Sequence, residues 1–202
     1  MRYELLRNPG ERNGLKNAVA RVVQFAKQND VKVVVAVESA GRPAAFLFEK
    51  AWKAMHPGET PPEIFFFDPY QVPSRTLLSP AVLGHPVFTR ASANPGHHVL
   101  VLDDTSQSGK TLGKMKRILK TAFKTVYTAS LWSLGNKPKR QDVAGVELKK
   151  WSQTGSPWQK KGSWIGVRRI SNVLFESETE ESAKLKKELE MLASQLGKTK
   201  RS

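Results

Sequence analysis

One stretch of the chain decides the fold, and it reads Val99-Leu100-Val101-Leu102-Asp103-Asp104-Thr105-Ser106-Gln107-Ser108-Gly109-Lys110-Thr111. Four apolar residues end a buried strand, two carboxylates follow, and a short loop rich in hydroxyl groups leads into a helix. Ligands of open α/β sheets bind at the carboxyl ends of strands, where this loop falls. The N–H groups and the positive dipole end of the following helix favour phosphate there. Two carboxylates beside a phosphate-binding turn, which we call the phosphate seat, indicate ribose hydroxyls or a hydrated Mg²⁺ as their partners.

Strand and helix patterns alternate on both sides of this stretch. Helices are expected from a cap at Asn13, from Pro43 to about Met55, and from Gly109 along an apolar face that reaches Val126. Strands are expected over 31–37, 64–67, 98–102, 126–132 and 164–167. This alternation predicts an α/β fold with a mainly parallel sheet flanked by helices.

The end of the chain predicts a separate helix. Ser177 and Glu180 have the spacing of a capping box. Apolar positions then recur at a 4-3-4 spacing, at Leu185, Leu189, Leu192 and Leu196. We therefore expect a main domain over 1–175 and a helical tail over 176–202 that packs on the domain or forms a homodimer.

Positive charge is concentrated in one part of the chain. The formal net charge is +15, and residues 110–169 hold 15 Lys and Arg against 2 Asp and Glu. Such a stretch attracts phosphorylated small molecules or nucleic acid, or serves as a solubilising surface. The chain has no cysteine, and no apolar run is long enough for a membrane helix. We expect no membrane partner and a cytoplasmic location.

A nucleotide-triphosphate P-loop is the rival interpretation of the deciding stretch. Ser108-Gly109-Lys110-Thr111 has the form of the end of that motif, which requires a glycine five residues before its second glycine. That position is Asp104, and a carboxylate-bearing residue cannot form the required glycine turn. The P-loop interpretation is therefore rejected.

The deciding stretch resembles the signature of type I phosphoribosyltransferases, an apolar strand, two acidic residues, three variable positions, Thr or Ser, Gly, any residue and Thr. Every defined position is filled. The resemblance implies that Asp103 and Asp104 are catalytic, hold the ribose hydroxyls of phosphoribosyl pyrophosphate (PRPP) and contact Mg²⁺ indirectly. It implies that the 5-phosphate is wrapped by Thr105, Ser106, Gln107, Ser108, Gly109, Lys110 and Thr111.

A second segment is similar to the pyrophosphate loop of the same family. It follows the strand over 31–37 and contains Ser39, Ala40, Gly41 and Arg42, of which Arg42 would add a charge-assisted contact. The proline-rich segment 68–96 falls where these enzymes carry a flexible catalytic loop. The resemblance implies that Arg75, with Arg90, neutralises the departing pyrophosphate; an ordinary surface loop is the alternative.

Base choice in this family comes from a variable hood, here expected over 133–175. Residues 140–147 and 164–167 faintly resemble the hood segments of purine enzymes, and Trp164, Trp158 or Trp151 could stack on a flat ring. Packing in a core is the alternative role of each tryptophan. One departure concerns Gln107, because 6-oxopurine enzymes have an Asp there that takes a proton from the base, which Gln cannot do.

Two functions follow from these observations. The first is a Mg²⁺-dependent phosphoribosyltransferase that moves the 5-phosphoribosyl group from PRPP to a nitrogenous base and releases pyrophosphate. The second is a non-catalytic regulator of the same fold that binds PRPP or a nucleotide, and binds RNA or DNA through its basic 110–169 surface. Pyrophosphate release with one nucleobase favours the enzyme, and salt-dependent nucleic-acid binding favours the regulator.

Overall fold

The computed structural model describes residues 3–38, 41–71, 84–106, 108–134, 141–148 and 180–198. Its centre is a five-stranded sheet in the order β2-β1-β3-β4-β5, and every neighbouring pair is parallel. The strands are β1 (Val31–Val37), β2 (Glu63–Phe67), β3 (His98–Ser106), β4 (Thr125–Leu134) and β5 (Val143–Leu148). The helices are α1 (Pro9–Gln28), α2 (Gly41–Met55), the short η1 (Pro69–Gln71), α4 (Pro86–Ala93), α5 (Lys110–Leu119) and α6 (Glu180–Lys198). The predicted α/β fold with a parallel sheet flanked by helices is confirmed.

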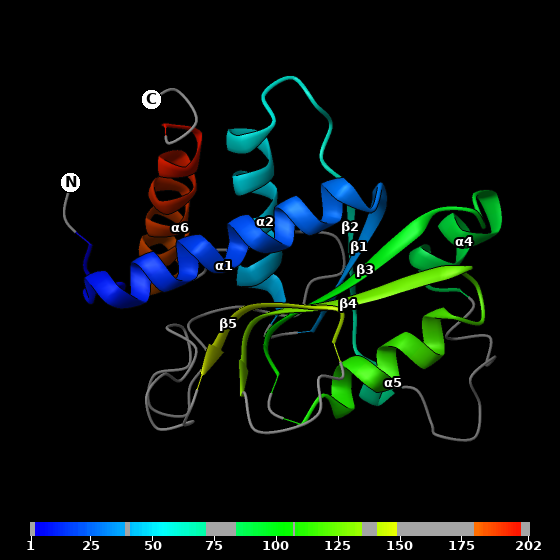
Figure 1. Ribbon diagram of the computed structural model, residues 1–202. Helices are drawn as coiled ribbons and strands as arrows, with labels where there is room; N and C mark the ends of the chain where they lie inside the picture. The colour runs from blue at the N-terminus through cyan, green and yellow to red at the C-terminus, as the bar shows by residue number, and fades with distance from the viewer. Residues whose placement is uncertain are drawn as a thin grey trace.

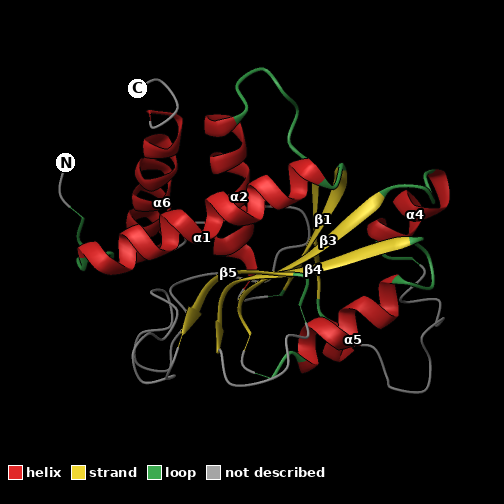
Figure 2. Ribbon diagram, in the orientation of Figure 1, coloured by secondary structure: helices red, strands yellow, loops and turns green. Residues whose placement is uncertain are grey.

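Helices cover both faces of the sheet, as Figures 1 and 2 show. Successive strand residues point to opposite faces, so β1 contributes Val34 to the core under α1, α2 and α6. Its neighbours Val33 and Val35 belong to the other core, under α4 and α5. A strand buried on both faces has to be apolar throughout, which explains the continuous valine run of β1.

Several predicted boundaries differ from the structure. The first helix begins at Pro9 and not at Asn13, because the side chain of Asn8 accepts hydrogen bonds from the N–H groups of Gly10 and Glu11 (2.8 and 3.4 Å). The apolar face expected to extend α5 to Val126 continues past the helix end at Leu119, into turns and β4. The segment 68–96, expected to lack regular structure, contains η1 and α4. The strand expected over 164–167 lies outside the described residues.

The C-terminal helix α6 belongs to the main core. Its four predicted leucines are buried in the same cluster as residues of α1 and α2. The buried carboxylate of Glu188 accepts hydrogen bonds from the backbone N–H groups of Glu4, Leu5 and Leu6 at 2.5, 2.9 and 2.8 Å. The apolar face of α6 is therefore used inside the chain. No helix of the described ranges combines the length and the hydropathy that crossing a bilayer requires.

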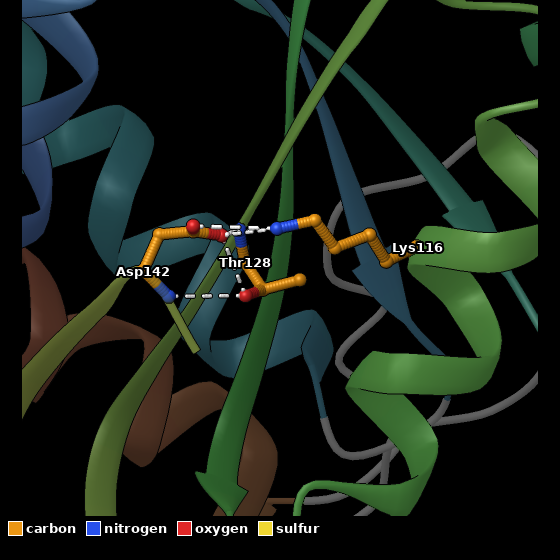
Figure 3. Close-up of polar contacts among 3 residues, drawn as sticks. All are labelled: Lys116, Thr128 and Asp142. Carbon is orange, nitrogen blue, oxygen red and sulfur yellow. Dashed lines mark hydrogen bonds and ion pairs between the residues drawn. The ribbon is translucent and has the colours of Figure 1, made fainter. Parts of the chain in front are cut away.

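The edge strand β5 occupies part of the segment expected to form the hood, and Asp142 fixes its start (Figure 3). One oxygen of Asp142 accepts hydrogen bonds from the backbone N–H and the hydroxyl of Thr128, at 2.7 and 2.9 Å. The ammonium of Lys116 in α5 lies 2.9 Å from the same oxygen. Partial burial raises the pKa of Asp142, but the hydrogen bonds from Lys116 and Thr128 outweigh it and hold the pKa below its ordinary value. Asp142 thus joins α5, β4 and β5.

We expect Asp142→Asn to lower the free energy of unfolding at pH 7 by about 1 kcal/mol, because hydrogen bonds to a charged group are replaced by weaker ones. A depressed pKa stabilises the folded state above the unfolded pKa of about 3.9, and this contribution is lost as pH falls through the folded pKa. The wild type should therefore lose its advantage below about pH 4. Urea unfolding at pH 7, 5 and 3.5 measures the difference, and a gap that persists unchanged at pH 3.5 contradicts the assignment.

Candidate functional site

The two loops that the sequence singled out meet at one point of the sheet. From β1 the chain moves outward to β2, and then crosses back to place β3 on the other side of β1. In open parallel sheets with this strand order, ligands bind outside the carboxyl ends of the strands where the direction of winding reverses. Here that point lies between β1 and β3. Glu38 follows β1 and Gly41 begins α2, whereas Asp103 to Ser106 end β3 and Lys110 begins α5.

A cavity of about 220 Å³ opens at the end of β3. Its lining residues are Asp103, Thr105, Ser106, Ser108, Gly109, Lys110, Thr111 and Leu112. All except Leu112 belong to the segment expected to bind PRPP. The volume is below the roughly 300–1,000 Å³ of a typical small-molecule site. It therefore suits one phosphorylated end of a ligand rather than a whole nucleotide.

The wall of the cavity formed by the start of α5 has the properties of a phosphate seat. Gly109 precedes the helix in the left-handed conformation (φ 67°), which side chains rarely adopt, and it provides no side-chain cap. The first N–H groups of a helix have no acceptor within it. The hydroxyl of Ser108 is 3.4 Å from the N–H of Lys110, which is a weak contact. The helix start therefore offers N–H donors and its positive dipole end to an anion.

Two neighbouring carboxylates lie at the end of β3, and one of them, Asp103, lines the cavity. Asp103 and Asp104 are 7% and 1% exposed. Asp103 accepts a hydrogen bond from the N–H of Asp104, and Asp104 accepts one from the hydroxyl of Thr105, both at 2.9 Å. Burial raises the pKa of Asp103 well above its ordinary value, the Asp104 carboxylate raises it further, and the Asp104 N–H offsets this only in part.

The segment after β1 brings the start of α2 close to the backbones of β1 and β3. A Cβ at Gly41 would lie 3.1 Å from the Leu102 carbonyl oxygen, so this close packing favours glycine. Arg42 is 1% exposed, forms an ion pair with Glu38 and lies 4.2 Å above the ring of Phe66. Its guanidinium points inward in this conformation, and its contact with pyrophosphate stays a prediction.

Tyr70 reaches the phosphate seat, and the sequence analysis did not identify it. Its hydroxyl lies 2.9 Å from the hydroxyl of Thr111, and its N–H donates to the side chain of Asp68 at 2.8 Å. The side chain is 69% exposed. An aromatic residue directly after the end of β2, at the edge where the other two loops lie, is the signal that could have found it.

Other predicted site residues lie elsewhere or outside the described ranges. Arg90 is paired with Glu63 at the start of β2 (2.7 Å). This position is at the amino ends of the strands, whereas the cavity lies at their carboxyl ends, so the predicted contact of Arg90 with pyrophosphate is wrong. Trp132, which belongs to the basic 110–169 stretch, is buried in the core and adds no aromatic surface to it. The predictions for Ser39, Ala40, Arg75, Gln107, Trp151, Trp158 and Trp164 fall outside the described residues.

The donor set fits a Mg²⁺ ion shared with a ligand. Within the described ranges, no three His, Asp or Glu side chains gather into a complete metal site. Mg²⁺ commonly uses one or two carboxylates and completes its coordination with water and substrate phosphates. Asp103 and Asp104 supply such carboxylates beside the phosphate seat.

Comparison with known proteins finds similarity of fold. The hypoxanthine phosphoribosyltransferase of Trypanosoma cruzi aligns with a TM-score of 0.48 and 19% sequence identity, over 68% of this chain and 76% of that chain. The same enzyme in complex with the product IMP aligns with a TM-score of 0.44 and 15% identity, over 68% and 75% of the two chains. No family model matches the sequence. No curated protein matches it either.

Proposed function

We propose that the protein is a Mg²⁺-dependent type I phosphoribosyltransferase, which moves the 5-phosphoribosyl group of PRPP to a nitrogen of a base and releases pyrophosphate. The observation that carries the proposal is the cavity at the end of β3. Seven residues of the phosphoribosyltransferase-like motif line it, among them Asp103 at the end of β3 and Lys110 and Thr111 at the start of α5. It also lies where the winding of the sheet reverses, the usual place for a ligand in such a fold.

Each wall has a separate task in the proposed reaction. The N–H groups at the start of α5 and the hydroxyls of Ser108 and Thr111 hold the 5-phosphate. Asp103 and Asp104 accept hydrogen bonds from the ribose hydroxyls and orient the sugar. The bond from C1 of the ribose to pyrophosphate breaks, pyrophosphate leaves with the electron pair, and a base nitrogen forms the new bond and loses its proton. Mg²⁺, when bound near the carboxylates, neutralises charge on the leaving pyrophosphate.

A screen of nucleobases for pyrophosphate release tests the activity directly. The protein is incubated with PRPP, Mg²⁺ and one base at a time, and pyrophosphate is measured. We expect release with one base or a small group of related bases. Because Gln107 cannot take a proton from a 6-oxopurine, bases that ionise without that help are the first to test. PRPP binding without release for any base would favour the non-catalytic alternative.

We expect Gly109→Val to weaken PRPP binding at least tenfold, which corresponds to about 1.4 kcal/mol. A β-branched residue does not tolerate the left-handed backbone at this position, so the helix start must move away from the cavity. Isothermal titration calorimetry with PRPP and Mg²⁺ measures the change.

Gly58 provides a matched control for that variant. It also has a positive φ (86°), a Cβ there would have no neighbour within 4 Å, and the residue does not line the cavity. Gly58→Val imposes the same kind of backbone strain at a distance from the site. It should leave PRPP affinity unchanged. Equal affinity losses in the two variants would show that general destabilisation is responsible.

A further inference from the structure

We infer that the outer face of α5, together with Tyr70, is a binding surface for single-stranded nucleic acid. Apart from Lys110, which lines the cavity, and Tyr70, whose hydroxyl contacts Thr111, this surface lies outside the proposed reaction. Between residues 110 and 134 the sequence holds six Lys and Arg and no Asp or Glu. In the structure α5 lies on the face of the sheet opposite α1, α2 and α6 (Figure 1). Its apolar residues are buried against the sheet, whereas Lys110, Arg117 and Lys120 are exposed. The cations therefore lie on a surface and do not belong to the core.

Four of these cations are exposed, namely Lys110, Arg117, Lys120 and Lys124. Within the part of the chain that the structure describes, none of the four forms an ion pair. Lys116 differs, because its ammonium is held by Asp142. At these four positions the positive charge thus stays available to a partner after folding. The charge of Lys116 is neutralised by Asp142, so a test should not rely on that lysine.

The length of the surface excludes PRPP as the sole reason for the charge. A helix rises about 1.5 Å per residue, which puts Lys120 roughly 15 Å from Lys110 along the axis. A sugar phosphate seated at Gly109 cannot contact both ends. Cations one turn apart along a helix suit a chain of phosphates instead, and a flexible single strand can follow them.

An exposed aromatic side chain lies at one end of this row and indicates a partner with bases. Among the described large apolar side chains, Tyr70 is the exposed one, at 69%. The ammonium of Lys114 lies 5.2 Å from the centre of its ring, and its hydroxyl is fixed by Thr111. Proteins bind single-stranded nucleic acid with this combination, in which cations contact the phosphates and an aromatic ring stacks on a base. An acidic peptide or a membrane would use the charge but would not need the ring.

The experiment measures binding of a fluorescent 15-nucleotide mixed-sequence RNA, and of the same DNA sequence, by anisotropy at several salt concentrations. We expect the logarithm of affinity to fall linearly with the logarithm of salt concentration, by about 0.7 per phosphate contacted. Arg117→Glu with Lys120→Glu should weaken binding at least tenfold and reduce the slope by about 1.4. PRPP affinity should not change, because neither residue lines the cavity.

Lys16→Glu with Lys187→Glu is the matched control. Within the described residues neither lysine forms an ion pair, they lie on α1 and α6 on the opposite face, and their reversal changes the net charge by the same amount. Only a small effect is expected. Equal losses in the two double variants would overturn the proposal, since net charge alone would then explain binding.

Tyr70 separates nucleic acid from other polyanions. We expect Tyr70→Ala to weaken oligonucleotide binding about tenfold by removing a stacking surface, whereas Tyr70→Phe should keep most of the affinity. Neither change should affect binding of heparin, which has charge but no bases. No oligonucleotide binding by the wild type at 50 mM salt would overturn the proposal, as would a Tyr70→Ala variant that binds as tightly as the wild type.

Discussion

Asp103→Asn should bind PRPP at least tenfold more weakly than the wild type, a loss of about 1.4 kcal/mol or more, and should nevertheless be no less stable. Asp103 lines the cavity, where its two carboxyl oxygens can accept hydrogen bonds from ribose hydroxyls. An amide offers one acceptor oxygen in the same shape. The substitution therefore removes part of the site while the volume of the side chain is kept.

The stability of this variant follows from the burial of the carboxylate. Burial and the neighbouring Asp104 raise the pKa of Asp103 above its ordinary value. For an acid this means that the favourable contribution is fully present below the unfolded pKa of about 3.9 and is lost as pH rises toward the folded pKa. The folded state therefore carries a cost for ionising this buried group beside a second carboxylate. Asparagine removes that cost and keeps an acceptor for the N–H of Asp104.

Calorimetry with PRPP and thermal unfolding at pH 7 test both halves of this expectation. Asp142→Asn is the control, because that carboxylate does not line the cavity and its loss should reduce stability without changing PRPP affinity. Unchanged PRPP affinity in Asp103→Asn would remove the main support for the proposed function. A large drop in its melting temperature would instead mean that the buried carboxylate is structural.

Gly145→Ala should lower the free energy of unfolding by about 3 kcal/mol. A Cβ at this position in β5 would lie 2.5 Å from the Cβ of Ala18 and 2.6 Å from the carbonyl oxygen of Leu131. Both distances are shorter than van der Waals contact, and the carbonyl of Leu131 belongs to the backbone of β4, which cannot rotate away. Helix α1 must therefore move away from the sheet. The guanidinium of Arg21, which donates to the carbonyl of Gly145 at 3.1 Å, ties the same two elements together. The melting temperature should fall by roughly 6–12 °C.

Gly113→Ala is the matched control for this packing effect. Nothing lies within 4 Å of a Cβ at Gly113, which lies inside α5 and is exposed. Alanine there should stabilise the protein by about 0.4–1 kcal/mol, because it restricts the unfolded chain and favours the helix. Replacing glycine by alanine is thus expected to lower the free energy of unfolding at Gly145 and to raise it at Gly113. A mild effect at Gly145 would indicate that α1 can shift over β5 at little cost.

Local patterns were enough to predict the fold class and to select the segment that we propose to bind phosphate. A strand buried on both faces must be apolar throughout, so the valines of β1 and the run from Val99 to Leu102 identified the centre of the sheet. The turn from β3 to α5 is formed by residues adjacent in sequence. The types of residue in this turn could therefore be interpreted from the sequence alone. In the structure most of them line one cavity.

Helix boundaries were less predictable, since they depend on individual hydrogen bonds. Asparagine is a favoured helix N-cap, so Asn8 and Asn13 are both suitable by residue type. Only in the folded chain is Asn8 the cap of α1. The end of α5 at Leu119 is similar, because the apolar residues beyond it fill the same core from a turn and a strand. Apolar spacing does not distinguish these cases.

Contacts between residues far apart in sequence were decided by the tertiary structure alone. The pairing of Lys116 with Asp142, the inward turn of Arg42 and the position of Arg90 at the amino ends of the strands each depend on which elements become neighbours. Tyr70 reaches Thr111 because β2 and β3 end at the same edge. The sequence by itself thus determined the fold class, the segment proposed to bind phosphate and where positive charge accumulates. The three-dimensional arrangement determined which of those charges remain exposed, because only packing brings each cation to its carboxylate or leaves it facing water.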